Sequence, residues 1–357
     1  MQRKLKMNEI LTPHAVKALL LWYQQNKRDL PWRHTSDPYR IWVSEIMLQQ
    51  TRVEAVKPYY ARFLESCPDV GALAALPEEK LMKLWEGFGY YSRARNLQKA
   101  ARVVVEQYGG VMPKTYEELL KLPGIGEYTA GAIASIAYGI RVPAIDGNVL
   151  RVLARVSASN ADITLPETKK EFRESLLHIV PLEAGDFTQS LIELGATVCA
   201  PNREPMCECC PLREECKARH EGRTNEIPVR SPKKPRRIEE KTVFLIRDGD
   251  RTALCKRPAK GLLSGLYELP NVEGHLCEEE VLAHLRSLGF EPLRIQKIEN
   301  AKHIFTHIEW HMIAYDVLIT PEFDGLHGKS GMLLIQNQDL HRHYAIPSAF
   351  GAYVKYL

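Results

Sequence analysis

The spacing of hydrophobic positions divides the chain into two parts. From about residue 8 to residue 216, apolar residues recur every three or four positions, and turn sequences such as Pro113-Lys114 and Pro123-Gly124 interrupt them. This spacing is typical of amphipathic helices that each bury one face. We therefore expect the first part to be entirely α-helical.

In the last third of the chain the apolar positions follow the shorter period of β-strands. Residues 242–247 and 252–256 are strand-like, and Asp248-Gly249-Asp250 between them favours a hairpin. A helical pattern over residues 278–287 and a strand-rich stretch over residues 303–319 follow. The sequence therefore predicts a mainly α core followed by a smaller α/β domain.

A basic segment connects the two parts. Residues 228–238 contain three prolines and five Lys or Arg residues but no acidic residue. This composition is typical of an extended, solvated connector, and the same charges could also contact phosphate groups. We expect a core domain over residues 8–216, a linker over residues 217–240 and a second domain over residues 241–357.

Length, composition and charge limit the class of protein. The 357 residues exceed one ordinary domain, and 45% hydrophobic with 26% charged residues is typical of globular proteins. The net charge is only +4, so affinity for a polyanion must come from local basic clusters. The basic residues 1–6 precede neither a cleavage site nor a membrane-length apolar run. We expect no export signal and no membrane partner.

Five of the eight cysteines lie close together near the end of the helical part. Two residues separate Cys207 from Cys210, five separate Cys210 from Cys216, and seven separate Cys199 from Cys207. Four thiolates in one loop suit an iron–sulfur centre or zinc, although a zinc ribbon usually pairs two Cys-x-x-Cys units and this loop has one. Buried cysteines without a metal are a third interpretation. Clustered thiols favour a reducing, cytoplasmic location.

Residues 115–138 have the pattern of two helices joined by a tight turn. Thr115 and Glu118 predict the capped start of a short helix that ends at Leu122, and a second helix is predicted over residues 127–138. In the turn between them, Gly124 and Gly126 allow close approach of a partner, and free N–H groups at the start of the second helix suit a phosphate. The segment predicts a DNA-binding helix-hairpin-helix, although an ordinary helix connection could use the same turn.

These features together resemble a known family. Residues 122–126 (Leu-Pro-Gly-Ile-Gly), Asp146 and the cysteine loop resemble the endonuclease III superfamily of base-excision enzymes. Within it, three segments resemble the MutY adenine glycosylases: residues 44–51 (Ser-Glu-Ile-Met-Leu-Gln-Gln-Thr), 87–93 (Gly-Phe-Gly-Tyr-Tyr-Ser-Arg) and 192–196 (Ile-Glu-Leu-Gly-Ala). The resemblance covers nearly the whole chain.

The resemblance implies a DNA repair glycosylase with a 4Fe-4S cluster. It implies hydrolysis of the bond between sugar and adenine in double-stranded DNA, where adenine faces 8-oxoguanine or guanine, by a monomer in the bacterial cytoplasm. The implied cluster ligands are Cys199, Cys207, Cys210 and Cys216. Six residues is the commoner family spacing after the first cysteine, so Cys209 is an alternative to Cys207.

Two carboxylates are predicted in contrasting surroundings. Asp37 is placed as the N-cap of a helix on which Ile41 and Trp42 neighbour Glu45, so desolvation should raise the pKa of Glu45 and keep it protonated near neutrality. Asp146 is placed as the N-cap of the next apolar run, where free N–H groups favour its ionised form. Such a pair suits acid-assisted cleavage of a glycosidic bond. From the residues alone, the first carboxylate could also pair with an arginine and the second could be an ordinary cap.

The resemblance gives these residues roles. Glu45 would protonate adenine, and Asp146 would stabilise the sugar oxocarbenium ion or capture it covalently. Asn148 and Tyr128 would complete the electrostatic surroundings. Tyr128 stands where lyase members place a Schiff-base lysine, so no lyase activity is expected.

The resemblance also implies residues that contact the substrate. Glu193 would read the edge of the adenine. Leu48, Gln50 and Tyr90 match positions that wedge or stack into the gap left by the extruded base. The full set of implied DNA-contacting residues in the helical part is Arg33, Leu48, Gln50, Thr51, Tyr90, Gly124, Gly126 and Glu193.

The last part of the chain resembles the Nudix-like domain of the same family, which is related to MutT nucleotide hydrolases. Gly274 and Glu280 could begin a hydrolase box, but Leu288-Gly289 and Pro292-Leu293 stand where its acidic metal ligands belong. We therefore expect no metal-dependent pyrophosphatase activity.

Phe305, Thr306 and His307 fall where the family has a loop that senses 8-oxoguanine. Oxidation turns guanine N7 from an acceptor into an N–H donor, so the hydroxyl of Thr306 could accept a hydrogen bond from the lesion and not from guanine. The alternative is a strand whose Thr and His side chains only face solvent.

Two other classes of function compete with the glycosylase. A bifunctional lyase acting on damaged pyrimidines would need the lysine that Tyr128 replaces. A non-catalytic lesion-binding protein would not need Glu45 together with Asp146. The residues therefore favour a monofunctional adenine glycosylase.

Overall fold

Contacts divide the chain into two compact units. The computed structural model describes residues 10–201, 203–232, 234–320 and 331–357. The first unit contains the chain up to residue 75 and residues 95–232, and the second contains residues 76–94 and 233–357. The predicted basic start of the chain, the first two residues of the predicted core domain and Lys233 of the predicted linker lie outside the described residues.

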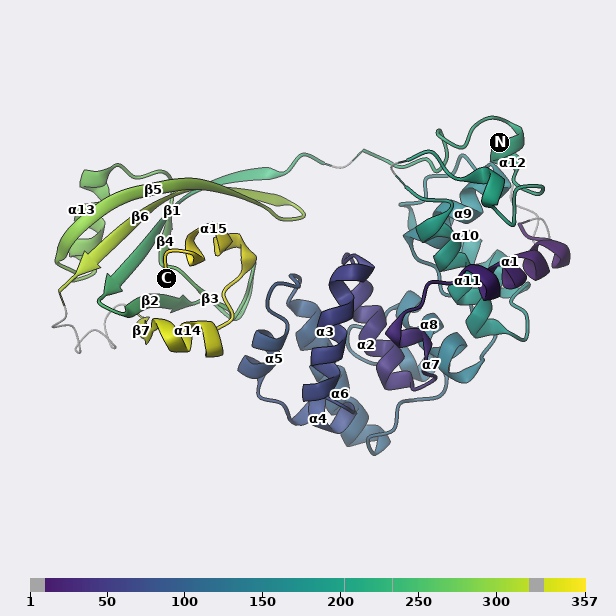
Figure 1. The fold of residues 1–357 in the computed structure, drawn as a ribbon, viewed down its shortest axis with the longest axis horizontal. Coiled ribbons are helices and arrows are strands. Elements are labelled where there is room, and N and C mark those ends of the chain that lie inside the picture. The colour runs from purple at the N-terminus through teal and green to yellow at the C-terminus, as the bar shows by residue number, and fades with distance from the viewer. Residues whose placement is uncertain (1–9, 202, 233, 321–330) are drawn as a thin grey trace. The chain divides into compact units, whose positions relative to one another are not determined.

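The described part of the first unit is helical, as the hydrophobic spacing predicted (Figure 1). Short turns separate the helices, and Pro or Gly stands at several of their ends. No helix among the described residues is long and apolar enough to cross a membrane. The helices that precede the sheet are α1 (Pro13–Asn26), α2 (Pro38–Leu48), α3 (Val53–Ser66), α4 (Val70–Ala75), α5 (Glu78–Leu84), α6 (Ser92–Tyr108), α7 (Tyr116–Leu119), α8 (Glu127–Tyr138), α9 (Gly147–Ser157), α10 (Pro166–Leu177), α11 (Ala184–Thr197) and α12 (Lys217–His220), of which α5 belongs to the second unit.

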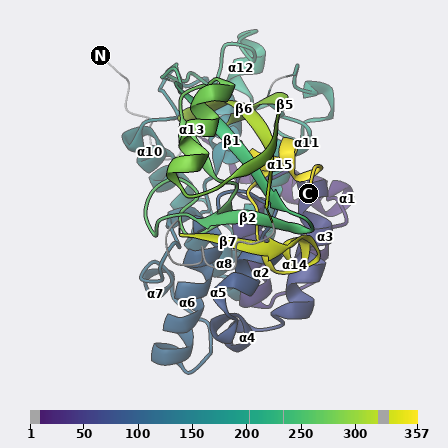
Figure 2. The same ribbon diagram turned by 90° about the vertical axis from the view of Figure 1, so that its left-hand side faces the viewer.

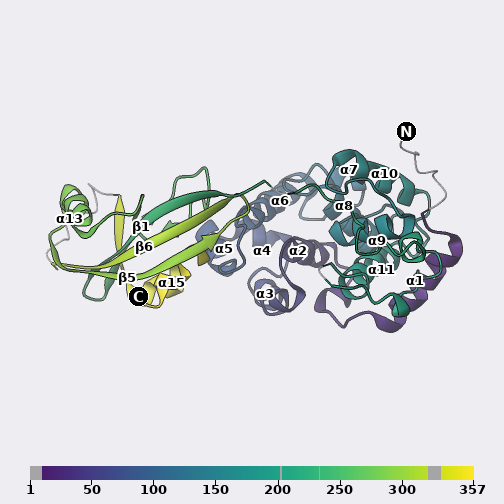
Figure 3. The ribbon, with the colours of Figure 1, turned by 90° about the horizontal axis from the view of Figure 1, so that it is seen from above.

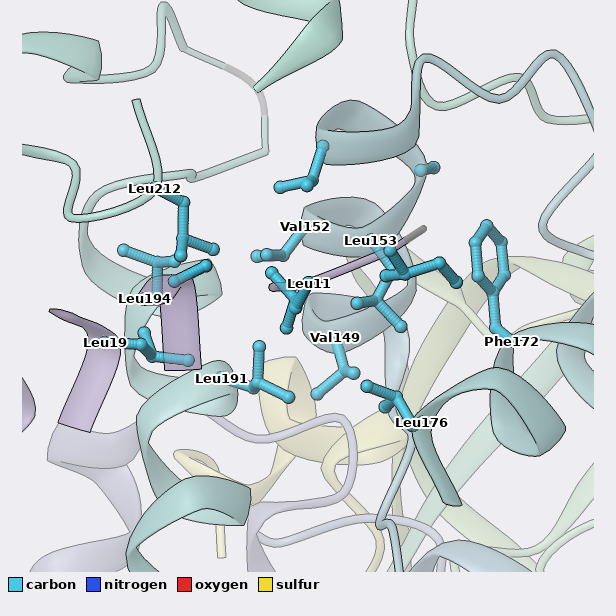
Figure 4. Close-up of a cluster of buried hydrophobic side chains, with 14 of the residues drawn as sticks. Leu11, Leu19, Val149, Val152, Leu153, Phe172, Leu176, Leu191, Leu194 and Leu212 are labelled. Atoms are coloured by element: carbon cyan, nitrogen blue, oxygen red, sulfur yellow. The ribbon is translucent and has the colours of Figure 1, made fainter. Parts of the chain in front are cut away.

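Helix α9 is surrounded by apolar side chains from its neighbours. Val149, Val152 and Leu153 of α9 pack in one buried cluster with residues of α1, α10 and α11, as Figure 4 shows for Leu19, Phe172, Leu176, Leu191 and Leu194. Burial of this many apolar side chains fixes the axis of the helix. The residue that caps the start of α9 is therefore held by the core of the first unit.

The second unit is built on one mixed sheet. Its strands are β1 (Arg237–Asp248), β2 (Arg251–Lys256), β3 (Tyr267–Glu268), β4 (Asn271–Glu273), β5 (Pro292–Ile304), β6 (Ile308–Ile319) and β7 (Met332–Gln336). The order is β3-β2-β1-β6-β5, with β4 paired to β1 and β7 paired to β2. Only the pairing of β1 with β6 is parallel among those described. Figure 3 shows β1, β6 and β5 side by side.

Helices cover both faces of this sheet. Val243 and Leu245 of β1 pack with α14 (Asn337–His343) and α15 (Gly351–Val354), whereas Phe244 and Ile246 pack with α13 (Glu278–Ser287). Figure 2 shows α13 against the sheet. Successive side chains of a strand point to opposite faces, so one strand supplies two cores.

Several predicted elements agree with the structure, and others differ in extent. The predicted helices 127–138 and 278–287 are α8 and α13, and the predicted hairpin joins β1 to β2. The strand-rich stretch was predicted to begin at residue 303, but β5 begins at Pro292. Most residues in the first part of β5 are exposed or half-buried, and its register shifts twice, so the strand lacks the alternation that marks a half-buried strand.

Candidate active site

Glu45 lies on α2, a helix whose residues are almost all buried. Asp37 caps the start of α2 by accepting a hydrogen bond from Tyr39 N at 2.9 Å, as predicted. Glu45 itself is only 7% exposed. The pKa of Glu45 is raised to about 7: burial is the largest cause, the hydrogen bond from Tyr128 lowers the pKa, the charge of Asp146 raises it and the charge of Arg33 lowers it. The carboxyl therefore holds a proton near neutral pH, as the sequence predicted.

Tyr128 binds directly to Glu45. It lies in the first turn of α8, and its hydroxyl donates a hydrogen bond to Oε2 of Glu45 at 2.5 Å. Burial and the nearby charges of Glu45 and Asp146 raise the pKa of Tyr128 well above its usual value, so the phenol remains a donor. Since Oε2 accepts this bond, Oε1 of Glu45 is the atom that can carry the transferable proton.

Asp146 caps the start of α9, as predicted. Its Oδ1 accepts from Asn148 N and Val149 N, both at 2.8 Å, and its Oδ2 accepts from Asn148 Nδ2 at 2.7 Å. The hydrogen bonds of the cap favour the ionised form of Asp146, as predicted. Burial outweighs the three hydrogen bonds and raises the pKa of Asp146. The donors limit this rise and keep the carboxylate oriented.

Arg151 connects the active-site cap to α11 and the cysteine loop. Its NH2 donates to Asn148 Oδ1 at 2.8 Å and to the carbonyl of Gly195 at 2.7 Å, and its Nε donates to the carbonyl of Cys199 at 2.8 Å. A Cβ at Gly195 would lie 2.6 Å from Cβ of Asn148, so only glycine allows this approach. Arg151 was not predicted as a site residue. The sequence signal that could have identified it is a positively charged residue within a helical run of mostly apolar residues.

Glu193 is held between two arginines. Its Oε1 accepts from the main-chain N and from Nε of Arg28 at 3.0 and 2.8 Å, and its Oε2 accepts from Arg28 and Arg33 at 2.8 and 2.6 Å. Burial alone would raise the pKa of this carboxyl, but the arginine hydrogen bonds outweigh burial and hold it at about 2. Arg33 was predicted as a site residue, whereas Arg28 was missed because nothing in the local pattern distinguishes it.

Leu48, Gln50 and Thr51 lie where α2 ends. Leu48 and Thr51 are half-buried, and Gln50 is exposed with a φ of +61°. A positive φ is uncommon for a residue with a side chain and directs this side chain away from the path of the helix. The structure therefore presents Gln50 to solvent.

The predicted hairpin joins α7 to α8. Gly124 has a φ of +77°, and a Cβ there would lie 2.6 Å from Cβ of Asn96. Gly126 is the N-cap of α8, and no side chain caps this helix start. The positions of both glycines agree with the expected tight turn. The preceding helix ends at Leu119 and not at Leu122, because a turn replaces its predicted last residues.

The predicted lesion-sensing residues form the loop between β5 and β6 in the second unit. The ring of Phe305 packs edge-on against His303 and Trp310, with centroids 4.6 and 4.9 Å apart. Thr306 and His307 are exposed. Residue Tyr90 belongs to the same unit, and its hydroxyl lies 3.0 Å from Oγ1 of Thr306. The structure thus brings Tyr90 and Thr306 together.

The four predicted cluster ligands line one cavity. Cys199, Cys207, Cys210 and Cys216 contribute to its wall together with Arg155, whose NH1 lies 3.2 Å from Sγ of Cys199. Cys209 is exposed and does not line this cavity. Within the described ranges, no three His, Cys, Asp or Glu side chains are grouped closely enough to hold a metal ion. The soft donors and the adjacent cation fit an anionic thiolate-bound cluster in composition.

Comparison with known proteins decides the family. Residues 43–181 match the HhH-GPD superfamily of base excision DNA repair proteins, and residues 242–356 match the NUDIX domain. The adenine DNA glycosylase of Mus musculus is 37% identical in a match 360 residues long, gaps included. The match covers 84% of this chain and 70% of that protein. The adenine DNA glycosylase of Buchnera aphidicola subsp. Baizongia pistaciae is 33% identical over 295 residues, which cover 82% of each. This chain belongs to the adenine DNA glycosylase family.

Solved structures agree with the fold of this adenine DNA glycosylase. A thermostable thymine-DNA glycosylase matches with a TM-score of 0.53 and 32% identity over 58% of this chain and 95% of that one. A non-covalent endonuclease III–DNA complex matches with a TM-score of 0.51 and 24% identity over 63% of this chain and 100% of that one, which shows the shared fold alone. The predicted helix-hairpin-helix core with a Nudix-like domain is therefore confirmed, as is the predicted enzyme class.

Proposed function

We propose that this adenine DNA glycosylase acts on adenine paired with 8-oxoguanine, and also with guanine, as a monomer on double-stranded DNA. The observation that carries the proposal is a buried, proton-holding Glu45 bound to Tyr128 and close to Asp146. The enzyme hydrolyses the bond between adenine and deoxyribose and leaves an abasic site.

The proposed reaction begins with proton transfer from Glu45. The proton on Oε1 passes to a ring nitrogen of the extruded adenine, which otherwise leaves poorly as an anion. Tyr128 keeps its hydrogen bond to Oε2 throughout, so the carboxyl stays oriented as its charge changes. The electron pair of the glycosidic bond moves to the departing base, and positive charge develops on the sugar.

Asp146 stabilises that positive charge. The two amide N–H groups and the amide of Asn148 fix its oxygens and favour the carboxylate over the acid. Water then adds to the sugar, and its proton returns to the carboxylate of Glu45. Tyr128 has no amine that could form a Schiff base, so the strand remains intact after adenine leaves.

Glu193 is proposed to read the adenine edge. In the structure each of its oxygens accepts two hydrogen bonds, so a base must replace an existing donor. The side chain of Arg28 is 37% exposed and that of Arg33 only 9%. The side chain of Arg28 is therefore the donor that can turn away into solvent.

Thr306 supports the proposed preference for 8-oxoguanine. It lies in an exposed loop, next to Phe305, whose ring packs against the rings of His303 and Trp310. This packing fixes the main chain beside the hydroxyl of Thr306. A hydroxyl can accept from the N7–H that only the oxidised base carries.

We propose that Cys199, Cys207, Cys210 and Cys216 bind a 4Fe-4S cluster. These four cysteines line the cavity, whereas Cys209 does not. A bound cluster ties the segment between α11 and α12 into a closed loop.

The decisive experiment uses duplexes that hold one adenine opposite 8-oxoguanine, guanine or thymine. We expect free adenine and abasic sites from the first two duplexes, with strand breaks only after heat or base, and little trapping of the enzyme on DNA by borohydride. Glu45→Gln protein prepared in parallel controls for a contaminating glycosylase. Equal release opposite thymine, or efficient borohydride trapping, would overturn the proposal.

A further inference from the structure

Two side chains of residues 76–94 bind the main chain near the C-terminus. Nζ of Lys83 donates to the carbonyl of Tyr344 at 3.1 Å, and Oε1 of Glu86 accepts from the amide of Ile346 at 2.9 Å. Lys83 and Glu86 also pair with each other, with Nζ and Oε2 2.6 Å apart. We call these four interacting residues the Lys83–Glu86 clip.

The surroundings of the clip should make it more stabilising than an ion pair on the exposed surface. The side chains of Lys83 and Glu86 are only 24% and 32% exposed. Each also forms a charge-assisted hydrogen bond to a main-chain group, and such bonds are stronger than bonds between neutral partners. Nearby, Glu79 of α5 lies 3.4 Å from both Lys256 and the hydroxyl of Tyr267, distances typical of weaker contacts. Between residues 78–86 and the part of the unit that holds the sheet (residues 233–357, the sheet domain), the clip is therefore a stronger polar attachment than the contacts of Glu79.

The loop that follows the clip has a fixed shape. Trp85 is fully buried, and its Nε1 donates to the carbonyl of Gly89 at 3.1 Å. The guanidinium of Arg93 donates to the carbonyls of Phe88 and Gly89 at 3.2 and 3.3 Å. The same guanidinium lies 5.4 to 5.7 Å from the ring centroids of Trp85, Phe88 and Tyr90. A continuous set of contacts therefore runs from Trp85, the neighbour of Glu86, to Tyr90.

Tyr90 makes a second contact with the sheet domain. It has a φ of +47°, which is uncommon for a residue with a side chain and persists only where the surroundings hold it. Its hydroxyl lies 3.0 Å from Oγ1 of Thr306. Residues 83–90 thus contact the sheet domain at both ends, at Tyr344 and Ile346 and again at Thr306.

We propose that the Lys83–Glu86 clip makes residues 83–90 part of the lesion-reading apparatus, with Glu86 as a positioning residue that sets Tyr90 against Thr306. Because the clip holds residues 83–90 against the sheet domain, Tyr90 and the hydroxyl of Thr306 contact DNA as parts of one rigid body. The inference rests on the proposed role of Thr306 in reading 8-oxoguanine. It assigns to Glu86 an effect on discrimination between opposite bases and none on the chemical step.

Glu86→Ala tests this role, with Glu86→Gln as the conservative variant and Glu106→Ala on the exposed side of α6 as the matched control. The measured quantity is the ratio of dissociation constants for duplexes with adenine opposite 8-oxoguanine and opposite guanine. We expect Glu86→Ala to reduce this preference roughly three- to tenfold, the scale of one lost hydrogen bond, and Glu86→Gln to reduce it less. Glu106→Ala should retain it.

Two further readouts separate positioning from general destabilisation. Hydrogen exchange at the amide of Ile346 should become faster in Glu86→Ala, while single-turnover adenine release at saturating enzyme should stay within about twofold of the parent. If Glu86→Ala does not fold, Lys83→Met breaks the same clip and should give the same loss of preference. The inference would be overturned, and the proposed function left intact, by a folded Glu86→Ala variant that exchanges the Ile346 amide faster but keeps the parent's preference for 8-oxoguanine over guanine. Equal affinity of the parent enzyme for both duplexes would overturn the proposed role of Thr306, and the clip's role with it.

Discussion

At the scale of single residues, opposing influences set the pKa of Glu45, the proposed proton donor. This pKa is raised from an ordinary 4.5 to about 7 because the effect of burial outweighs the hydrogen bond from Tyr128, which lowers the pKa. Since the folded-state pKa is the higher one, the stabilising effect of the bound proton is fully present below about pH 4.5 and is lost as pH rises through about 7. The proposed acid is therefore available near neutral pH and is lost in mildly alkaline solution.

Tyr128→Phe tests this balance. Removing the hydroxyl removes the hydrogen bond that lowers the pKa of Glu45, so this pKa should rise. The alkaline limb of the single-turnover rate profile should shift to higher pH, and the rate at low pH should fall less than tenfold if the hydroxyl mainly orients the carboxyl. Rate profiles of the parent and the variant between pH 5 and pH 9 check it. An alkaline limb that moves to lower pH would contradict the assigned direction.

Substitutions of Asp146 separate its capping role from its catalytic role. Asparagine caps helices about as well as aspartate, so Asp146→Asn should change the free energy of unfolding by less than about 1 kcal/mol, whereas Asp146→Ala should cost about 0.5–2 kcal/mol. If the charge stabilises the sugar cation, Asp146→Asn should still lower adenine release by roughly 100-fold or more. Denaturant unfolding and single-turnover rates measure the two effects. A fully active Asn variant would leave Asp146 with a structural role alone.

At the scale of elements, the cysteine loop between α11 and α12 has a prediction of its own. Purified protein should be brown and contain about four irons per chain. Cys209→Ser should keep the iron because Cys209 lies outside the cavity, and Cys210→Ser should lose it. Iron analysis and visible absorption of both variants check the ligand set. Colourless, active protein with stoichiometric zinc, or loss of iron from Cys209→Ser, would contradict it.

Elements with local signals were predictable from the sequence, and pairings across long separations were not. Capping residues and periodic apolar faces marked α2, α8, α9 and α13, so the sequence placed Glu45, Tyr128 and Asp146 on the correct elements. The arginine pair around Glu193 joins residues 165 and 160 positions apart, and no local pattern encodes such a contact. The net rise in the pKa of Asp146 could not be predicted from the cap either, because burial depends on the packed core.

At the scale of the whole molecule, the residues proposed for catalysis and those proposed for lesion reading belong to different compact units. Glu45 and Asp146 lie in the first unit, and Tyr90 and Thr306 lie in the second, which also includes residues 76–94. A protein truncated before residue 228 would lose the partners of Lys83 and Glu86 as well as Thr306. A point substitution in the loop therefore separates the two functions more cleanly than a truncation.

Thr306→Ala should narrow the preference for 8-oxoguanine without changing the chemistry. A lost hydrogen bond of this kind costs about 1–3 kcal/mol, and less where water replaces the hydroxyl. Thr306→Ser keeps the acceptor and is the matched control. Affinities and single-turnover rates for duplexes with 8-oxoguanine or guanine opposite adenine measure the effect. Equal discrimination by the parent and Thr306→Ala would remove Thr306 from the sensing role.

Glu45 is the proposed proton donor on which the other roles depend, and adenine release by Glu45→Gln tests it most directly. Gln keeps an acceptor for the hydroxyl of Tyr128 but has no proton to give, so binding to adenine mispairs should persist while the single-turnover rate falls at least about 100-fold. Glu65→Gln on the exposed side of α3 should behave like the parent. Near-parental adenine release by Glu45→Gln, with mispair binding intact, would contradict the account.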